Sequence, residues 1–293
     1  MFVIQATVVF AAAPPTENVS VFTGPYTTPP SPMDEYSFSD PSIYEAIRTE
    51  LVTSGVSSVT LRSNSISTII TNKVQSLEIT DLDGIELKSN DIKNIILYFP
   101  NLQSLRLENC YIVSIPAEIE NLFNLEELYL NNNEITNLNN VNLNNMNTLN
   151  VLELNNCKIN DLSSIFNSSN LSVLRLENNA ITSDMIPKEI NVPKLTELDL
   201  SYNQLTQTPL VLKDLQMLKR LYLVGNQFAK DPSSYFSNLE VIEVKSDKNT
   251  TLQAKVTTST YFPELNFNGY SFRNCSFFSE IFSLFNKYIN SND

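Results

Sequence analysis

The chain has 293 residues, a formal net charge of −13, no histidine and three cysteines. This acidic balance disfavours nucleic acid as a partner, because phosphate binding needs a basic stripe and Lys and Arg here cluster no further than pairs such as Lys219-Arg220. The absence of histidine excludes Ser-His and Cys-His nucleophile pairs and His-ligated zinc within this chain.

Residues 1–13 form an apolar run that ends in consecutive alanines. The run is too short to span a bilayer and is typical of the core of a signal peptide, which predicts a secreted or cell-surface protein. Two features weaken this signal, because no Lys or Arg precedes the run and Pro14 follows it where cleavage would occur. The alternative is the apolar terminus of a cytoplasmic protein.

Residues 14–40 are rich in proline, serine and threonine, and this composition predicts a disordered linker. A helix is expected next, over residues 41–55. Asp40 suits its N-cap and Pro41 its first position, and apolar side chains recur at i, i+4 and i+8, at Ile43, Ile47 and Leu51. We expect this helix to cover the apolar end of the array that follows, because the terminal units of a stacked array need caps.

Residues 56–249 contain about nine copies of one pattern, L-x-x-L-x-L-x-x-N-x-I, which is clearest from Leu125 to Ile135. The copies open at positions 56, 74, 102, 125, 149, 171, 195, 218 and 239, so the period is near 23 residues. Pattern and period resemble those of the leucine-rich repeat (LRR) superfamily, in particular the LRR region of receptor-like and secreted proteins. The resemblance implies an α/β fold, a right-handed LRR solenoid with a parallel β-sheet on the concave face, short helices or turns on the convex face, and a cap at each end.

The spacing of the leucines has a direct physical meaning. A period of two places Leu128 and Leu130 on one face of a short strand and Tyr129 on the other. One unit cannot bury its apolar face alone, so neighbouring units must stack. At the ninth position the chain turns inward, and an amide there can pair the buried backbone groups. The residues expected in this structural ladder are Asn64, Cys110, Asn133, Cys157, Asn179, Asn203 and Asn226.

The two cysteines of the ladder are expected to act as small, burial-tolerant residues with weak hydrogen-bonding ability, which removes them from any catalytic role. Cys110 and Cys157 would lie two strands apart, about 9–10 Å, which is too far for a disulfide. Cysteine usage therefore does not argue for an oxidising compartment and does not exclude one.

Two stretches depart from the repeat. The interval of 28 residues between the copies that open at 74 and 102 lacks the asparagine and holds a helix-like segment at 92–99, so we expect a local break in the solenoid. Residues 250–293 place large apolar side chains at helical spacing, at Phe277, Ile281, Phe285 and Ile289. This segment predicts an aromatic-rich C-terminal cap.

The fifth position of each copy faces solvent on the strands and forms one column across the sheet. Its members in the more regular copies are the candidate ligand-binding residues Arg106, Tyr129, Glu153, Arg175, Asp199 and Tyr222. We expect Arg175 to form lateral ion pairs with Glu153 and Asp199, since neighbouring strands lie about 4.8 Å apart. The plainer interpretation is a solvated face whose charges pair with each other.

The sequence offers no catalytic residues, cofactor-binding residues or metal ligands. Its five glycines are isolated and cannot form a phosphate-binding loop, and the acidic run from Asp81 to Glu86 lacks the spacing of a calcium loop. We therefore expect a non-catalytic recognition module without a small-molecule cofactor that binds a protein or peptide on the concave face, as the ectodomain or secreted form of a receptor-like protein. Any membrane link would come from a segment outside this chain. The alternative is an intracellular scaffold or regulatory subunit that docks an enzyme.

Overall fold

The structure is a computed structural model and describes residues 32–53, 55–56, 65–236 and 238–244. Several predictions lie outside these residues, namely the apolar run 1–13, most of the linker 14–40, Asn64 of the structural ladder and the C-terminal cap 250–293.

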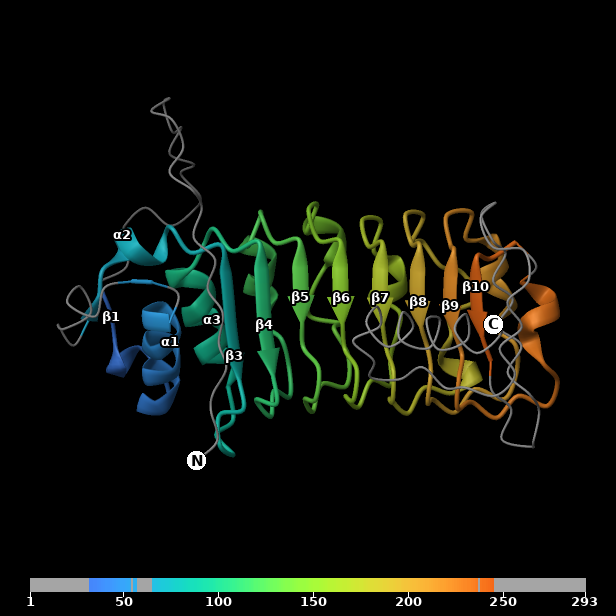
Figure 1. The fold of residues 1–293 in the computed structure, drawn as a ribbon, viewed down its shortest axis with the longest axis horizontal. Helices are drawn as coiled ribbons and strands as arrows, with labels where there is room; N and C mark the ends of the chain where they lie inside the picture. Colours follow the sequence, from blue (N-terminus) through green and yellow to red (C-terminus); the bar gives the residue numbers. More distant parts are fainter. Residues whose placement is uncertain (1–31, 54, 57–64, 237, 245–293) are drawn as a thin grey trace, which may run out of the picture.

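One parallel sheet of eight strands runs along the whole described array (Figure 1). Its strands are β3 (Ser76–Thr80), β4 (Ser104–Glu108), β5 (Glu127–Tyr129), β6 (Val151–Glu153), β7 (Val173–Arg175), β8 (Glu197–Asp199), β9 (Arg220–Tyr222) and β10 (Val241–Glu243). Each strand pairs with the next one in sequence, so every repeat stacks directly on its neighbour. This topology confirms the predicted solenoid.

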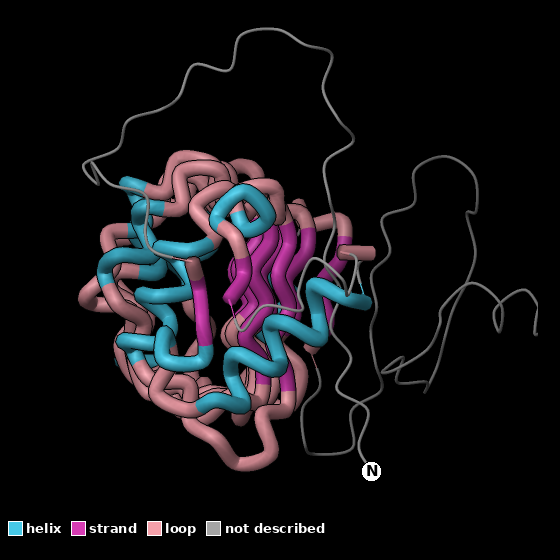
Figure 2. Tube along the Cα trace, turned by 90° about the vertical axis from the view of Figure 1, so that its left-hand side faces the viewer, coloured by secondary structure: helices cyan, strands magenta, loops and turns pink. Residues whose placement is uncertain are grey.

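Short helical turns cross the molecule on the side opposite the sheet (Figure 2). These turns are η2 (Ala117–Asn121), η3 (Leu143–Asn145), η4 (Ile165–Asn167), η5 (Ser183–Met185), η6 (Leu210–Asp214) and η7 (Pro232–Tyr235). The core lies between the two sides and is filled by leucines of the repeat, such as Leu128 and Leu130, which are 2% and 0% exposed. Full burial of one such side chain contributes about 1.5–3 kcal/mol.

A helix covers the first strand of the sheet, as the capping pattern predicted. Helix α1 (Pro41–Thr53) begins after Asp40, whose carboxylate accepts a hydrogen bond of 2.8 Å from the Ser42 N–H. Its buried side chains pack against β3 and belong to the same core as the repeats. They include Ile43, Ile47 and Leu51.

Residues 32–40 are ordered, where the composition predicted the end of a disordered linker. Strand β1 (Met33–Asp34) pairs antiparallel with β2 (Ser65–Ile66), and η1 (Glu35–Ser37) follows it, while α2 (Thr68–Thr71) leads into β3. Met33 is fully buried, and the Ser39 N–H and Oγ donate to the carboxylate of buried Asp91 at 2.6 and 2.7 Å. These tertiary contacts override the local composition.

The predicted break between residues 79 and 101 is wrong. Strands β3 and β4 pair over five residues each, from Ser76 with Ser104 to Thr80 with Glu108, so the sheet is continuous there. The additional residues of this interval form helix α3 (Ser89–Tyr98), which occupies the side opposite the sheet. A longer interval between repeats therefore lengthens the helical side without disturbing the strands.

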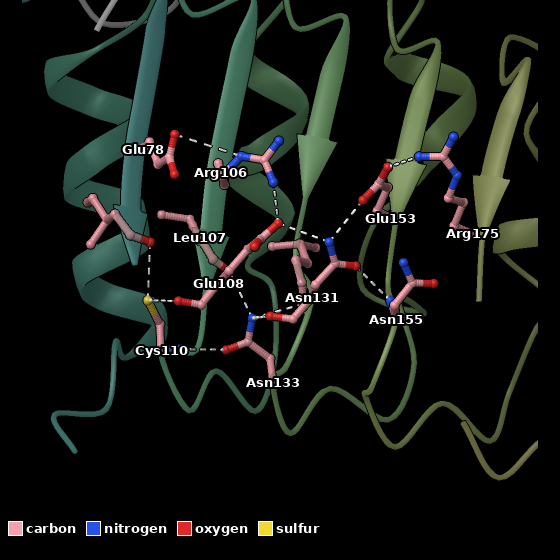
Figure 3. Close-up of polar contacts among 12 residues, drawn as sticks. Glu78, Arg106, Leu107, Glu108, Cys110, Asn131, Asn133, Glu153, Asn155 and Arg175 are labelled. Atoms are coloured by element: carbon pink, nitrogen blue, oxygen red, sulfur yellow. Dashed lines mark hydrogen bonds and ion pairs between the residues drawn. The ribbon is translucent and has the colours of Figure 1, made fainter. Parts of the chain in front are cut away.

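Asn133 shows how the ninth position satisfies the backbone where the chain turns inward (Figure 3). Its Oδ1 accepts from the Cys110 and Ile112 N–H groups at 3.1 and 3.0 Å. Its Nδ2 donates to the carbonyls of Leu107 and Leu130 at 2.8 and 2.9 Å. One side chain thus ties the preceding repeat to its own.

The other described ladder residues make related contacts. The amides of Asn179, Asn203 and Asn226 each donate to the carbonyl of a leucine in the preceding repeat, at 2.8–2.9 Å. The Cys110 and Cys157 thiols donate to the carbonyls of Ile79 and Leu130 at 3.4 and 3.3 Å. Burial raises the pKa of these thiols to about 12 and about 11, so both stay protonated as donors.

A second column, which the sequence analysis did not identify, precedes the ladder by one residue. Its members adopt positive φ angles and are Asp81, Asn109, Asn132, Asn156, Asn178, Tyr202 and Gly225. Most are Asp, Asn or Gly, the residue types that tolerate this left-handed conformation. Tyr202 is the exception, and its ring lies so close to Gly225 that a Cβ there would meet Tyr202 Cδ1 at 2.6 Å.

Replacing Asn133 by leucine should destabilise the fold by about 1–3 kcal/mol, because buried backbone groups of two repeats lose their partners. The free energy of unfolding in urea measures the loss. Exposed Asn147 is the matched control, and Asn147→Leu should change stability little. Exposed Asn132 would be a poor control, since its φ of 58° makes leucine strained there. Equal unfolding midpoints for Asn133→Leu and Asn147→Leu would contradict the role of the ladder.

Gly225→Ala should destabilise the protein through both its φ of 72° and the contact with the Tyr202 ring. In a Tyr202→Asn background only the conformational cost remains, about 1–2 kcal/mol. A double-mutant cycle, measured by unfolding in urea, should therefore show that Gly225→Ala costs less stability in the Tyr202→Asn background than in the parent. An identical penalty in both backgrounds would show that the ring is not the obstacle.

Candidate binding face of the sheet

The strand register places all six candidate residues in a single row on the exposed face of the sheet. The paired positions run Glu78, Arg106, Tyr129, Glu153, Arg175, Asp199, Tyr222 and Glu243 from β3 to β10. We call this the central row. Because the repeat keeps the same phase in every copy, no strand rotates its fifth residue inward.

Two further rows share this face, because residues two positions away along a strand point the same way. The leading row consists of Ser76, Ser104, Glu127, Val151, Val173, Glu197, Arg220 and Val241. The trailing row consists of Thr80, Glu108, Asn131, Asn155, Glu177, Ser201 and Val224. We call the three rows together the sheet face.

Polar contacts cross the first half of the sheet face (Figure 3). Arg106 lies between Glu78 and Glu108, with N–O distances of 3.9 and 2.5 Å. Asn131 donates from Nδ2 to Glu108 and to Glu153, each at 2.9 Å. Contacts therefore connect β3 with β6 without interruption.

The second half continues the same chain of contacts. Arg175 pairs with Glu153 on β6 and donates to Glu197 Oε1 on β8 at 2.7 Å. Arg220 on β9 donates from Nε to Glu197 Oε2 at 2.7 Å. A continuous polar network thus extends from Glu78 on β3 to Arg220 on β9.

The predicted ion pair between Arg175 and Asp199 is wrong. Asp199 lies directly opposite Arg175 in the register, but its shorter carboxylate turns back to accept from the Ser201 N–H at 2.8 Å. Glu197 lies two residues earlier on the same strand and has a longer side chain. Its carboxylate accepts hydrogen bonds from arginines on both neighbouring strands. The sequence pattern identified the shared face but not the glutamate that carries the contact.

Glu197 and Glu153 are 7% and 8% exposed, so the network holds two nearly buried carboxylates. Burial alone would raise the pKa of Glu197, but hydrogen bonds from Arg175 and Arg220 outweigh it and lower that pKa below its usual value. Burial raises the pKa of Glu78 and is only partly offset by Arg106. Arginines therefore stabilise the ionised form of Glu197, in the centre of the face, more strongly than that of Glu78 on β3.

The two tyrosines of the central row, Tyr129 and Tyr222, are half-buried, and neighbouring side chains change the pKa of their phenols. The Arg106 guanidinium carbon lies 3.8 Å from the centroid of the Tyr129 ring, a cation–π contact. Burial and the adjacent Glu127 raise the pKa of Tyr129 to about 12. Burial, followed by Glu197 and Glu243, raises the pKa of Tyr222. Both phenols therefore remain neutral hydrogen-bond donors at physiological pH.

Comparison with known families gives matches within this array. A model described as leucine rich repeat matches residues 169–228, and a second one matches residues 101–122. The chain is a leucine-rich-repeat protein. Its solenoid is similar to an internalin from Listeria monocytogenes, with a TM-score of 0.53 and 24% identity over 74% of this chain and 66% of that one. This likeness concerns the fold.

This chain matches only a part of each of its curated relatives. Lumican of Coturnix japonica is 28% identical over 196 residues, 66% of this chain and 50% of that protein. Receptor-like protein 39 of Arabidopsis thaliana is 33% identical over 40% of this chain and 14% of its own length. Ras guanine nucleotide exchange factor V of Dictyostelium discoideum is 30% identical over 54% of this chain and 10% of its own length. This LRR chain thus spans about half the length of the lumican that it matches.

Among the residues that the structure describes, none of the helices has the length and apolar character needed to cross a bilayer.

The pKa of Glu197 predicts how the network responds to acid. A carboxylate whose pKa is lowered by folding stabilises the protein above its unfolded pKa, about 4.3, and this stabilisation is lost as the pH falls through the folded pKa. Glu197→Gln should therefore have a clearly lower free energy of unfolding than the parent at pH 7, and this difference should become smaller below about pH 4. Urea unfolding at several pH values measures the difference. A difference that does not depend on pH would contradict the lowered pKa of Glu197.

Proposed function

We propose that this chain is a non-catalytic recognition module that binds a protein or peptide on the sheet face. The observation that carries the proposal is the polar network from Glu78 to Arg220, which fixes side chains across seven strands. Side chains that are already ordered lose little conformational entropy on binding, so a pre-arranged face favours association.

The polar network also determines which residues of the sheet face would contribute most to the binding of a partner. Glu153 and Glu197 are nearly buried and serve the sheet itself. The side chains of Arg175 and Arg220 keep 39% and 38% of their surface exposed, so a ligand can contact them without breaking the sheet. Tyr129 and Tyr222 add aromatic surface at either end, and tyrosine and arginine are enriched among residues that dominate binding energy.

We place this module outside the cell or at its surface, as an ectodomain or a secreted form of a receptor-like protein. The relative named receptor-like protein 39 supports this setting. The apolar run at residues 1–13 agrees with it.

An intracellular scaffold that docks an enzyme is the second candidate. The match to the Ras guanine nucleotide exchange factor V supports it, since the matched segment spans 10% of that protein. Both candidates use the same sheet face, and they differ in the compartment where the partner is found.

Tyr129→Ala and Tyr222→Ala should each weaken binding of a partner by about 1–3 kcal/mol, because each removes aromatic contact area from a rigid face. The partner is first captured by photo-crosslinking from a benzophenone side chain placed at residue 224, which lies on the same face as Tyr222 and leaves both tyrosines in place. The captured protein is then titrated against the variants. Each variant is used only after its melting curve matches that of the parent.

The matched control lies on the loop opposite the sheet. Lys188 and Glu189 are both exposed there, and a Lys188→Ala/Glu189→Ala variant should bind as the parent does. Loss of affinity in this variant alone would place the ligand on the other side of the solenoid and would overturn the proposal.

A further inference from the structure

The guanidinium groups of the sheet face differ in how many of their nitrogens are already bound. Arg175 donates from Nε and Nη2 to Glu197 and pairs through Nη1 with Glu153, so all three of its nitrogens have a partner. Arg106 pairs through Nη1 with a glutamate of its own strand and lies over the Tyr129 ring. In both arginines, the edge formed by Nη1 and Nη2 is therefore at least partly occupied.

Arg220 is held through Nε alone. This nitrogen donates to Glu197 Oε2 at 2.7 Å. Among the residues that the structure describes, no acceptor lies within hydrogen-bond distance of its Nη1 and Nη2 groups. The side chain is also partly exposed. Arg220 therefore offers a ligand an edge with two parallel N–H donors.

The orientation of Arg220 is fixed by the polar network below it. Its partner Glu197 is nearly buried and is held in turn by Arg175, which pairs with Glu153 on β6. The hydrogen bond to Glu197 raises the pKa of Arg220, so its charge is secure. A cation that is already held in place loses little conformational entropy when a ligand binds.

Two positions beside Arg220 are apolar or aromatic. Val241 on β10 is its register partner and is half-buried. Tyr222 lies two residues further along β9 on the same face and is half-buried as well. Such neighbours reduce the access of water, which strengthens an ion pair formed at the guanidinium edge. They also provide contact area for an apolar side chain of the ligand.

The ligand group that fits this edge best is a single carboxylate. Two parallel N–H donors match two oxygens of a carboxylate or of a phosphate. The surroundings are negative, since the chain has a net charge of −13 and, after burial, Glu197 and Glu243 raise the pKa of Tyr222. This field opposes a doubly charged phosphate or a run of acidic residues more strongly than one carboxylate.

We infer that Arg220 binds the carboxylate of one aspartate or glutamate side chain of the partner through Nη1 and Nη2, while a neighbouring apolar side chain of the partner covers Val241 and Tyr222. This inference rests on the proposed function and specifies the chemistry of the partner at one subsite. The pair needs the planar fork of the guanidinium, so lysine, which keeps the charge, does not replace it.

The test selects a random peptide library, displayed on phage, against the whole protein. Enriched peptides are synthesised with a fluorescent label and an amidated C-terminus, which removes the carboxylate of the chain end. They should share one Asp or Glu beside an apolar residue. Replacing this residue by its amide should weaken binding to the parent about tenfold, and binding to Arg220→Lys by less than about twofold, as measured by fluorescence anisotropy.

Arg48→Lys is the matched control, because Arg48 has a similarly exposed side chain and lies on α1 at the other end of the array (Figure 1). The tenfold effect of the amide should persist in this variant. Each comparison uses two peptides on one protein, so a small loss of stability in Arg220→Lys does not affect it.

Three results would overturn the inference alone. They are an amide effect of equal size in Arg220→Lys and in the parent, enriched peptides without an acidic residue, and tighter binding when phosphoserine replaces that residue. The proposed function fails separately, when enriched peptides bind Tyr129→Ala and Tyr222→Ala as tightly as the parent. A selection that enriches no peptide would overturn both.

Discussion

The structure depends on the way its backbone is satisfied where each strand ends and the chain turns into the core. The groups exposed by that turn are buried, and leaving them unpaired would cost about 1–3 kcal/mol each. Asn133 pairs them from both sides, since its amide contacts carbonyls of two successive repeats and its oxygen accepts two N–H groups. Because this contact fixes each repeat against the previous one, all strands enter the sheet in the same phase.

A common phase makes the polar network possible. The register brings Glu153, Arg175 and Asp199 to one row, and side-chain length then decides which contacts form. Arg175 spans to Glu153 and Glu197, whereas Asp199 contacts the backbone of Ser201. A slip of one residue in any repeat would send an arginine or glutamate of this network toward the leucine core. The backbone contacts of the ladder and the surface charges are therefore linked.

The sequence predicted what depends on periodicity. The leucine core, the parallel solenoid, the helix after Asp40 and the row that contains Tyr129 all follow from spacing alone. It did not predict contacts that depend on side-chain conformation, such as the choice of Glu197 over Asp199. Nor did the composition of residues 33–40 reveal their order, because that order comes from buried Asp91 of a distant helix. The signal for the left-handed column was present in the repeated Asn before the ladder position.

The arginines and the nearly buried carboxylates of the sheet face depend on each other. Like charges on adjacent strands repel, so a row of carboxylates at this spacing destabilises a sheet unless cations lie between them. Arg175 does this between Glu153 and Glu197, where it lowers the cost of two nearly buried carboxylates. While they hold these carboxylates, the Arg175 and Arg220 side chains keep 39% and 38% of their surface exposed. The interaction that stabilises the sheet therefore also holds two guanidinium groups in fixed positions on its face.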